Sequence, residues 1–540
     1  MKKTVLLCAL LCAAGTMEVL AQEWGRCERP QARSILNVGN VQAELALGGM
    51  PIWPGEVSYE APKNGGVVAM TCLMTWFGGL VEGEPRIAAQ QELWAGPLDD
   101  QGRPPDDCAE YDRIYEITRT EIERYNRTGD LTQNLFDWPW RLGAPVLDGD
   151  GNPDNYNLQG GDRPALIGDQ MFWWVMNDAA GEHKLSHSLP VGMEVRVTAF
   201  AYGKPGPVGN TTFFRYTFVY KGDAPLDDAY FVLYPEADLG ERYDNFHGAD
   251  TTLHLVYAYN ADNYDGDEDH PSDDSYGANP PALGYTYLPP PMKDPAHTHQ
   301  RRSDNPFTGL AAFVTDPRYR DSAARYYNHM RGLRHDGKPY TVGGNGYDFS
   351  DIPTTIYYPG DPVTKSFWSE MNVDGQGTPG YPSYEAVIST GPFSMQPGDE
   401  HEIAFAIAWA RGDDHLDSVT RLKQSVANLH RYADFFLTPS TDLLAATPLP
   451  KTPAPLGFAQ NYPNPFSAST TIRYSLPQPM YVRLNVFDVL GRAVATLVDE
   501  QQRGGIYEVP FEAENLPGGV YLYRLQLDFL SFTKTMTLVR

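Results

Sequence analysis

TTFFRYTFVY at Thr211–Tyr220 and EIAFAIAWA at Glu402–Ala410 are the stretches that decide the fold of this chain. Both combine β-branched and aromatic residues, which favour strands. The turn at Met395–Asp399 predicts that Glu402–Ala410 forms a hairpin with the strand before it. The expected fold is therefore mainly β, a large β-sandwich body with a few helices. Further runs that read as strands lie at residues 194–202, 229–234, 253–259 and 385–390.

Two segments in the body have helical patterns. Apolar residues recur every three or four positions from Leu416 to Phe436, which predicts one continuous helix packed on the sandwich. Asp413 or Asp414 is expected to cap its first turn. Earlier in the chain, Thr120 and Glu123 have the spacing of a capping box, which predicts the start of a short helix.

A segment rich in Pro and Ala, Thr441–Pro455, predicts a semi-extended linker. It separates a body at Gln22–Ser440 from a tail at Leu456–Arg540. The length of the body fits one large or two closely packed sandwich domains.

The tail has the pattern of short strands separated by turns. Apolar residues alternate with other residues along Val482–Val486, the period of a strand with one buried face. Gly504 and Gly505 mark a turn further along. The tail is therefore expected to form six or seven strands in a small β-sandwich of Ig-like type. Because the tail contains no cysteine, the inter-sheet disulfide of immunoglobulins is excluded.

The same tail resembles the C-terminal sorting domain of the type IX (Por) secretion system of Bacteroidota and their relatives. The resemblance covers the whole tail, and its pieces follow the order of the family. It implies a transport signal that the outer-membrane type IX machinery reads, and that is often cleaved afterwards. The alternative is an ordinary terminal Ig-like domain that binds a ligand or acts as a spacer. The matching pieces are NYPNPF (461–466), TTIRYSLP (470–477), VFDVLGR (486–492), GGVYLYRL (518–525) and KTMTLVR (534–540).

The body is similar to an uncharacterised group of exported Bacteroidota-type proteins. This resemblance implies no known activity and no catalytic residues. The similar stretches are DGDGNPDNYNLQGGDRP (148–164), GNTTFFRYTFVYKG (209–222), PPALGY (280–285) and STGPFSMQPGDEHEIAFAIAWARG (389–412).

Residues 1–21 have the features of a secretory signal peptide. Lys2 and Lys3 precede an apolar run, and Ala21 ends a stretch suited to signal peptidase. Cleavage there would make Gln22 the first residue of the mature chain. No apolar stretch is long enough for a membrane span. The expected location is extracellular or on the outer-membrane surface, reached through the periplasm.

The chain is acidic, with 42 Lys and Arg against 69 Asp and Glu residues and a net charge of −27. Nucleic acids and anionic membranes would repel it, so neither is an expected partner. Three cysteines follow the signal peptide, so at most one disulfide can form within the chain. The sequence does not decide between two possible disulfides, Cys27 with Cys108 or Cys72 with Cys108.

The loop LDGDGNPDN holds the strongest candidate for a metal site. Asp148, Asp150, Asn152 and Asp154 alternate along it, and oxygen ligands at this spacing converge on calcium when a loop curls. The EF-hand pattern is broken, because Pro153 replaces the turn glycine and Gln159 stands at the position of the bidentate Glu. The alternative is a solvated turn. No other cofactor is expected.

Other polar and aromatic groups give weaker signals. The acidic run at 260–274 fits an exposed loop better than a calcium site, and His297 with His299 lacks a third metal ligand. No GxSxG, P-loop, GxGxxG after a strand or HExxH motif is present. Paired-carboxylate catalysis stays open, because sequence spacing does not give the separation of two carboxylates. Core tryptophans are favoured over a sugar-binding platform for Trp138, Trp140, Trp173, Trp174 and Trp368.

The sequence therefore favours a non-enzymatic protein with a structural or binding role, exported through the type IX system, with that machinery as its partner. The alternative is a secreted carbohydrate-binding or carbohydrate-hydrolysing protein, for which a surface glycan would be the partner.

Overall fold

The structure is a computed structural model of the 540-residue chain. The predicted signal peptide, His297, His299 and most of the predicted linker lie outside the residues that it describes. Those residues are 27–55, 57–268, 274–289, 310–312, 322–380, 387–443, 456–476, 480–502, 505–513, 516–527 and 530–540.

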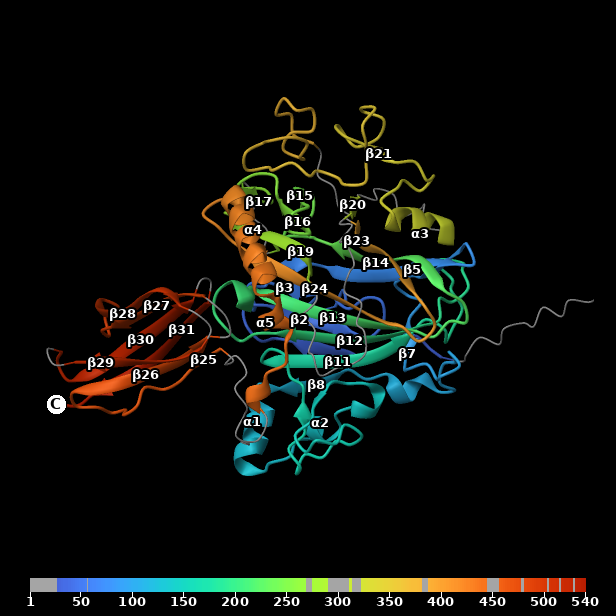
Figure 1. Ribbon diagram of the computed structural model, residues 1–540. Helices are drawn as coiled ribbons and strands as arrows, with labels where there is room; N and C mark the ends of the chain where they lie inside the picture. Colours follow the sequence, from blue (N-terminus) through green and yellow to red (C-terminus); the bar gives the residue numbers. More distant parts are fainter. Residues whose placement is uncertain are drawn as a thin grey trace, which may run out of the picture.

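Two large antiparallel sheets form the body, which confirms the prediction of a mainly β fold (Figure 1). The larger sheet has nine strands, and the smaller sheet has five. In spatial order the larger sheet contains β15 (Asn245–Asp250), β16 (Leu255–Asn260), β19 (Ala282–Leu288), β24 (Glu400–Ala410), β13 (Thr211–Tyr220), β12 (Met193–Ala201), β11 (Gln170–Asn177) and β7 (Trp94–Ala95), and β8 (Tyr115–Thr118) also pairs with β11. The smaller sheet contains β20 (Leu310–Ala312), β23 (Val387–Met395), β14 (Leu226–Glu236), β5 (Cys72–Val81) and β6 (Glu84–Ala88).

The predicted hairpin around residues 395–399 is wrong, because β23 and β24 belong to different sheets. The turn carries the chain from one sheet to the other. The backbone N–H of Tyr220, at the end of β13, donates to the carbonyl of Asp399 over 3.0 Å. This contact aligns β24 with β13, which leaves β23 to pair with β14.

Aromatic side chains fill the space between the two sheets. Phe214 and Phe405, on neighbouring strands of the larger sheet, stack with ring centroids 4.9 Å apart. Phe231 of the smaller sheet lies 5.0 Å from Tyr216 and 6.3 Å from Phe405. All four rings are buried, so this contact joins the two sheets into one core.

Helices cover the outer faces of both sheets. The predicted helix at 416–436 is two helices, α4 (His415–Arg431) and α5 (Ala433–Leu437), which meet at Tyr432. Asp414 is the cap, since its Oδ1 accepts the N–H of Asp417 over 2.7 Å. Helix α4 packs on β16, β19 and β24 of the larger sheet. Helix α3 (Ala323–Met330) packs on β6, β14 and β23 of the smaller sheet.

Helix α1 (Arg119–Thr128) begins two residues before the predicted start. The capping box is formed by Thr118 and Glu121, not by Thr120 and Glu123. Both pairs have the same spacing, and the end of β8 at Thr118 decides between them. The remaining short elements of the body are α2 (Gln133–Phe136), β1 (Arg33–Leu36), β2 (Gln42–Ala46), β3 (Tyr59–Glu60), β4 (Val68–Met70), β9 (Val146–Leu147), β10 (Arg163–Pro164), β17 (Tyr264–Asp265) and β18 (Gly277–Ala278).

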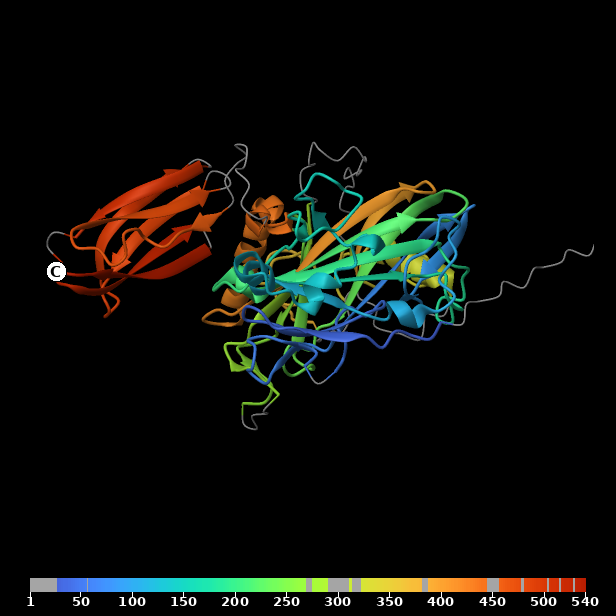
Figure 2. The same cartoon turned by 90° about the horizontal axis from the view of Figure 1, so that it is seen from below.

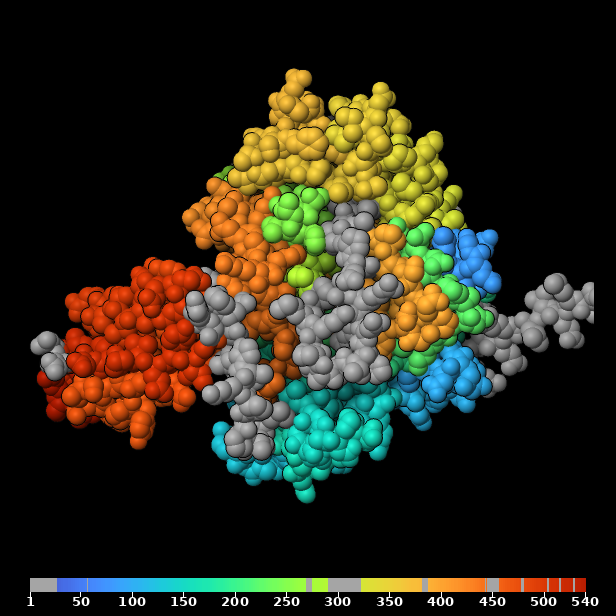
Figure 3. Space-filling model, in the orientation of Figure 1, coloured from blue at the N-terminus to red at the C-terminus, as the bar shows by residue number. Residues whose placement is uncertain are grey.

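Residues 331–380 form a cap over one edge of the larger sheet, and Figure 3 shows it as the yellow and orange crown of the molecule. It contains β21 (Tyr340–Thr341) and β22 (Pro353–Thr354). The N–H of Ala249, on the edge strand β15, donates to the carbonyl of Tyr358 over 3.0 Å. A second donation joins the N–H of His247 to the carboxylate of Glu370. The cap therefore shields the hydrogen-bonding groups of an exposed sheet edge.

The tail consists of one three-stranded and one four-stranded antiparallel sheet (Figure 2). Val482, Leu484 and Val486 are fully buried, which confirms the predicted alternation. The sheets are β25 (Gly457–Phe458), β26 (Ser469–Leu476) and β29 (Gly505–Glu512), and β28 (Ala493–Gln502), β27 (Met480–Phe487), β30 (Gly519–Leu527) and β31 (Leu530–Leu538).

One of the two open cysteine pairings is present in the structure. Cys27 and Cys108 form a disulfide with their Cα atoms 5.4 Å apart, whereas Cys72 is a buried free thiol in β5. Burial raises the pKa of the Cys72 thiol. Among the described helices, none combines the length and the apolar character that a membrane span requires.

Candidate functional site

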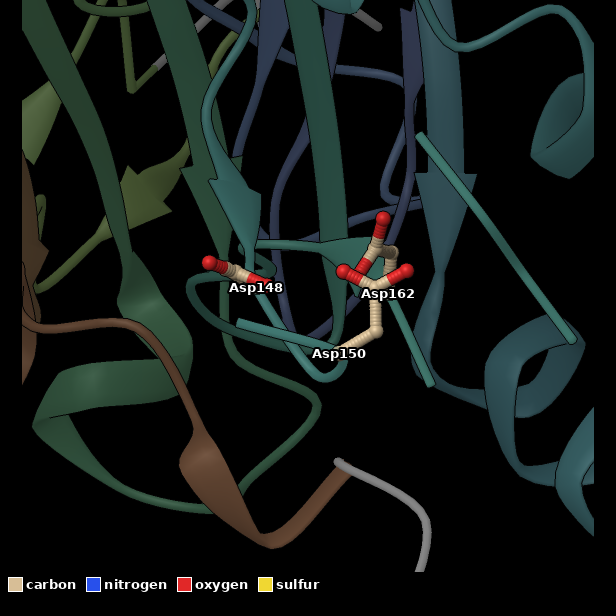
Figure 4. A group of neighbouring side chains, drawn as sticks. All are labelled: Asp148, Asp150 and Asp162. Atoms are coloured by element: carbon tan, nitrogen blue, oxygen red, sulfur yellow. The ribbon is translucent and has the colours of Figure 1, made fainter. Parts of the chain in front are cut away.

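The predicted calcium loop connects β9 to β10, and this short ladder brings its two ends together. Leu147 pairs with Arg163 across the ladder, so Asp148, directly after β9, lies beside Asp162, directly before β10. Asp148, Asp150 and Asp162 each place one carboxylate oxygen within 4.8 Å of the others. Figure 4 shows the carboxylates of Asp150 and Asp162 side by side, with that of Asp148 across the loop.

Backbone N–H groups hold these carboxylates in place. Asp148 Oδ1 accepts the N–H of Gly151 over 2.7 Å, and Asp162 Oδ1 accepts the N–H of Gly149 over 2.9 Å. The other oxygen of Asp162 accepts the N–H of Asn157 over 2.6 Å. Asp162 is only 1% exposed, so the loop buries one carboxylate while the other two face solvent.

Asp150 is held in its ionised form by amide groups around it. A hydrogen bond of 2.9 Å from the side chain of Asn157 is the main cause of its lowered pKa, with a further contribution from Asn155. The side-chain amide of Asn155 donates to Asp150 over 3.3 Å, while its own Oδ1 is buried without a hydrogen-bond partner. The loop thus combines three carboxylates with an uncommitted amide oxygen, the type of ligand that calcium prefers.

The predicted ligand set and the observed group overlap only in part. Asp148 and Asp150 belong to the group, but Asp154 does not. Asn152 instead donates its backbone N–H to Asp148 and Asp150, over 3.1 and 3.0 Å. Asp162 was missed because it lies eight residues beyond the predicted set, on the far side of the loop. The signal that could have found it is its position, which mirrors that of Asp148 about the loop.

Three described carboxylates in and before the acidic run at 260–274 each have contacts of their own. Asp250 forms an ion pair of 3.5 Å with Lys423, and Asp238 accepts the hydroxyl of Thr71 over 2.5 Å. Asp265 is buried and accepts the backbone N–H of Glu241 over 2.9 Å. Burial is the main cause that raises the pKa of Asp265 to about 7.

The tryptophans considered for a sugar platform lie mostly in the interior. Trp138, Trp173, Trp174 and Trp368 are buried, and only Trp140 is partly exposed. The Trp368 indole N–H donates to the carbonyl of Gly344 over 3.1 Å, inside the cap. Their interpretation as core residues therefore agrees with the structure.

The cap carries several exposed aromatic and apolar groups of the body, in addition to Phe136 and Tyr243 outside it. Phe349 is 57% exposed and Phe367 is 60% exposed, with Ile352 and Tyr347 also at the surface. The ring of Phe349 packs on Gly343 and Gly344, where a Cβ atom would lie 2.3 and 2.5 Å from the ring. Trp368 directly follows Phe367 in the chain, and its indole N–H is bonded to Gly344. The segments that carry the two exposed rings therefore both contact this glycine.

Sequence reasoning missed these residues because they lie in irregular segments without periodicity. Phe367 has a φ of +59°, a left-handed conformation that is rare for an aromatic residue. Such conformations concentrate at functional sites, but no local sequence pattern predicts one at a phenylalanine.

Comparisons with known proteins identify the tail. Residues 460–538 match the family model of the secretion system C-terminal sorting domain. A comparison with curated proteins finds no match. Among solved structures, a polysaccharide lyase aligns with 9% identity and a TM-score of 0.22, over 95% of this chain and 46% of the lyase chain. This chain thus spans less than half of the lyase, and so low a TM-score supports neither a common fold nor a common activity.

The tail is therefore a type IX sorting domain, as its sequence predicts, and the protein is exported to the cell surface or the extracellular space. The type IX machinery is the partner that this domain implies.

Proposed function

We propose that the body is a non-catalytic binding protein of the cell surface and that its cap contacts a neutral glycan. The exposed aromatic rings of Phe349 and Phe367 carry this proposal. Aromatic faces stack on the apolar faces of sugars, so two aromatic rings exposed on the cap suit contact with a glycan. The net charge of −27 favours a neutral glycan over an acidic one, because like charges repel.

Replacing both rings should abolish glycan binding. In the double variant Phe349→Ser/Phe367→Ser we expect affinity for neutral polysaccharides to fall by more than about 10-fold, because aromatic anchors dominate such contacts. Affinity electrophoresis in gels that contain a panel of neutral polysaccharides measures the change.

Leu189→Ser provides the matched control, since Leu189 is 53% exposed and lies outside the cap. This variant should bind like the parent protein. Equal binding by the double variant, or no retardation of the parent protein on any neutral polysaccharide, would contradict the proposal.

We also propose that calcium binds the loop between β9 and β10 through Asp148, Asp150 and Asp162 and stabilises the body. A ligand that binds only the folded state stabilises it by about 2.7 kcal/mol at 100 times its Kd. Saturating calcium should therefore raise the melting temperature relative to a chelator, and Asp162→Asn should remove most of this shift. The measurement is thermal unfolding followed by tryptophan fluorescence.

Asp154→Asn is the control for this experiment, because Asp154 lies in the same loop but outside the group of three carboxylates. It should keep the calcium-dependent shift. A melting temperature that does not respond to calcium, or an equal loss of response in both variants, would refute the site.

A further inference from the structure

The seven strands of the tail run between two ends that differ in their exposed side chains. We infer that the tail docks on a protein of the export machinery through an apolar patch at one of these ends. The patch consists of Val489, Leu490, Val520 and Val539 and is called here the exit patch, because the chain ends beside it. The inference rests on the sorting role of the tail and adds the surface that performs it.

Strand register places the members of the exit patch together. Phe487, the last residue of β27, pairs with Leu522 of β30, which in turn pairs with Thr535 of β31. Val489 and Leu490 follow Asp488 in the turn after β27, and Val520 pairs with Thr537, two residues before Val539. Neighbouring strands are about 4.8 Å apart, so these side chains lie within about two strand spacings of one another.

Hydrogen bonds tie the second sheet of the tail to the same end. The N–H of Val539 donates to the carbonyl of Phe466 over 2.8 Å, just before β26 begins. The Arg540 guanidinium donates to the carbonyl of Ala513 over 2.9 Å, just after β29 ends. These bonds fix the C-terminal residues in the folded sandwich, so the exit patch has a defined shape.

The chain enters the tail at the opposite end. Gly457 pairs with Ser475, near the end of β26, and the Tyr474 hydroxyl donates to Gln502, at the end of β28, over 2.7 Å. The exit patch therefore lies at the end remote from the attachment of the body. Figures 1 and 2 show the C-terminus on the side of the tail that faces away from the body. A partner can reach this end while the body is still attached.

The exit patch is apolar where surface turns are usually polar. Val489 is 68% exposed and Leu490 is 74% exposed, at the tip of the turn between β27 and β28. The Asp488 carboxylate shapes this turn by accepting the N–H groups of Leu490 and Arg492, each over 3.0 Å. The two apolar side chains are thus not required by the turn, and they point away from the core of the tail.

The two charged side chains of the turn beside Val489 and Leu490 pair with each other, which favours a protein partner over a charged surface. Asp488 and Arg492 form an ion pair of 2.7 Å next to the apolar tip. A shaped apolar surface complements a groove on a protein. The sorting-domain match at 460–538 includes Val489, Leu490 and Val520 but not Val539, so three of the four patch residues belong to the segment with the sorting role. This role makes the export machinery the proposed partner.

Export of the full chain tests the inference in the bacterium that produces it. The variants Leu490→Glu and Val539→Glu should each lower the fraction of protein outside the outer membrane by at least about 10-fold, with accumulation in the periplasm. Ile506→Glu is the matched control, because Ile506 is 58% exposed on the same sandwich but at the entry end. Its export should stay within about 2-fold of the parent.

Resistance of the tail to limited proteolysis shows whether each variant is folded. Normal export of the folded exit-patch variants would overturn the inference, as would an equal defect in Ile506→Glu. Normal export combined with loss of a dimer, measured by light scattering, would assign the patch to a second copy of this chain and would also overturn it. Export that fails only on deletion of the whole tail would leave the sorting role intact and reject this surface.

Discussion

Removal of Leu456–Arg540 should leave the protein in the periplasm, with the fraction outside the cell falling by more than about 10-fold. The expected effect is large because the sorting-domain match lies entirely within the deleted segment. The body should still fold, since its aromatic core lies between sheets made only of residues before 411. Fractionation of cells that express the shortened and the full chain measures the change.

Tryptophan fluorescence provides the control for folding of the shortened chain. All ten tryptophans precede Ala410, so their signal reports on the body alone. The shortened chain should show the same emission maximum and nearly the same unfolding transition as the full chain. Normal export of the shortened chain would contradict the assignment of the tail as the sorting signal.

Phe405→Ala should cost about 3–5 kcal/mol of the free energy of unfolding, the range found for large buried aromatic residues. Phe405 is fully buried and contacts rings from both sheets, among them Phe214 at 4.9 Å and Phe231 at 6.3 Å. Its loss leaves a cavity at the junction of the two sheets. Urea unfolding followed by tryptophan fluorescence measures the loss for the body.

Phe136→Ala is the matched control, because Phe136 is 63% exposed. Its cost should stay below about 0.5 kcal/mol, as is usual for surface substitutions. If Phe405→Ala were as mild as this control, the stacked aromatic rings would not be the core that joins the sheets.

The composition of its strands predicted the class of the fold, but the pairing of those strands depended on distant contacts. Thr211–Tyr220 and Glu402–Ala410 were recognisable as strands from β-branched and aromatic residues alone. The predicted hairpin at 395–399 failed because a short turn can also carry the chain between two sheets. In this chain the pairing of β24 with β13, two strands far apart in the sequence, decides between them.

Helix boundaries show the same limit at a smaller scale. The apolar period from Leu416 to Phe436 predicted a helix across the whole segment, and helices occupy nearly all of it. The period did not show the break at Tyr432, because the apolar side chains on both sides of the break still face the sheet.

The acidic loop was predictable in part. The alternating oxygen ligands predicted a site that includes Asp148 and Asp150, and their carboxylates do lie together. Asp162 joins them only because β9 and β10 close the loop, and strands of two residues leave almost no pattern in a sequence. The exposed rings of Phe349 and Phe367 could not be predicted at all, since exposure there depends on how irregular segments of the cap fold over one another.

The central claim is that Leu456–Arg540 directs export, and quantitative mass spectrometry of peptides from the body tests it most directly. The periplasm and the material outside the outer membrane are compared in cells that express the full chain or the chain without the tail. The predicted result is body peptides outside the cell for the full chain and in the periplasm for the shortened chain. The same distribution for both chains would contradict the claim.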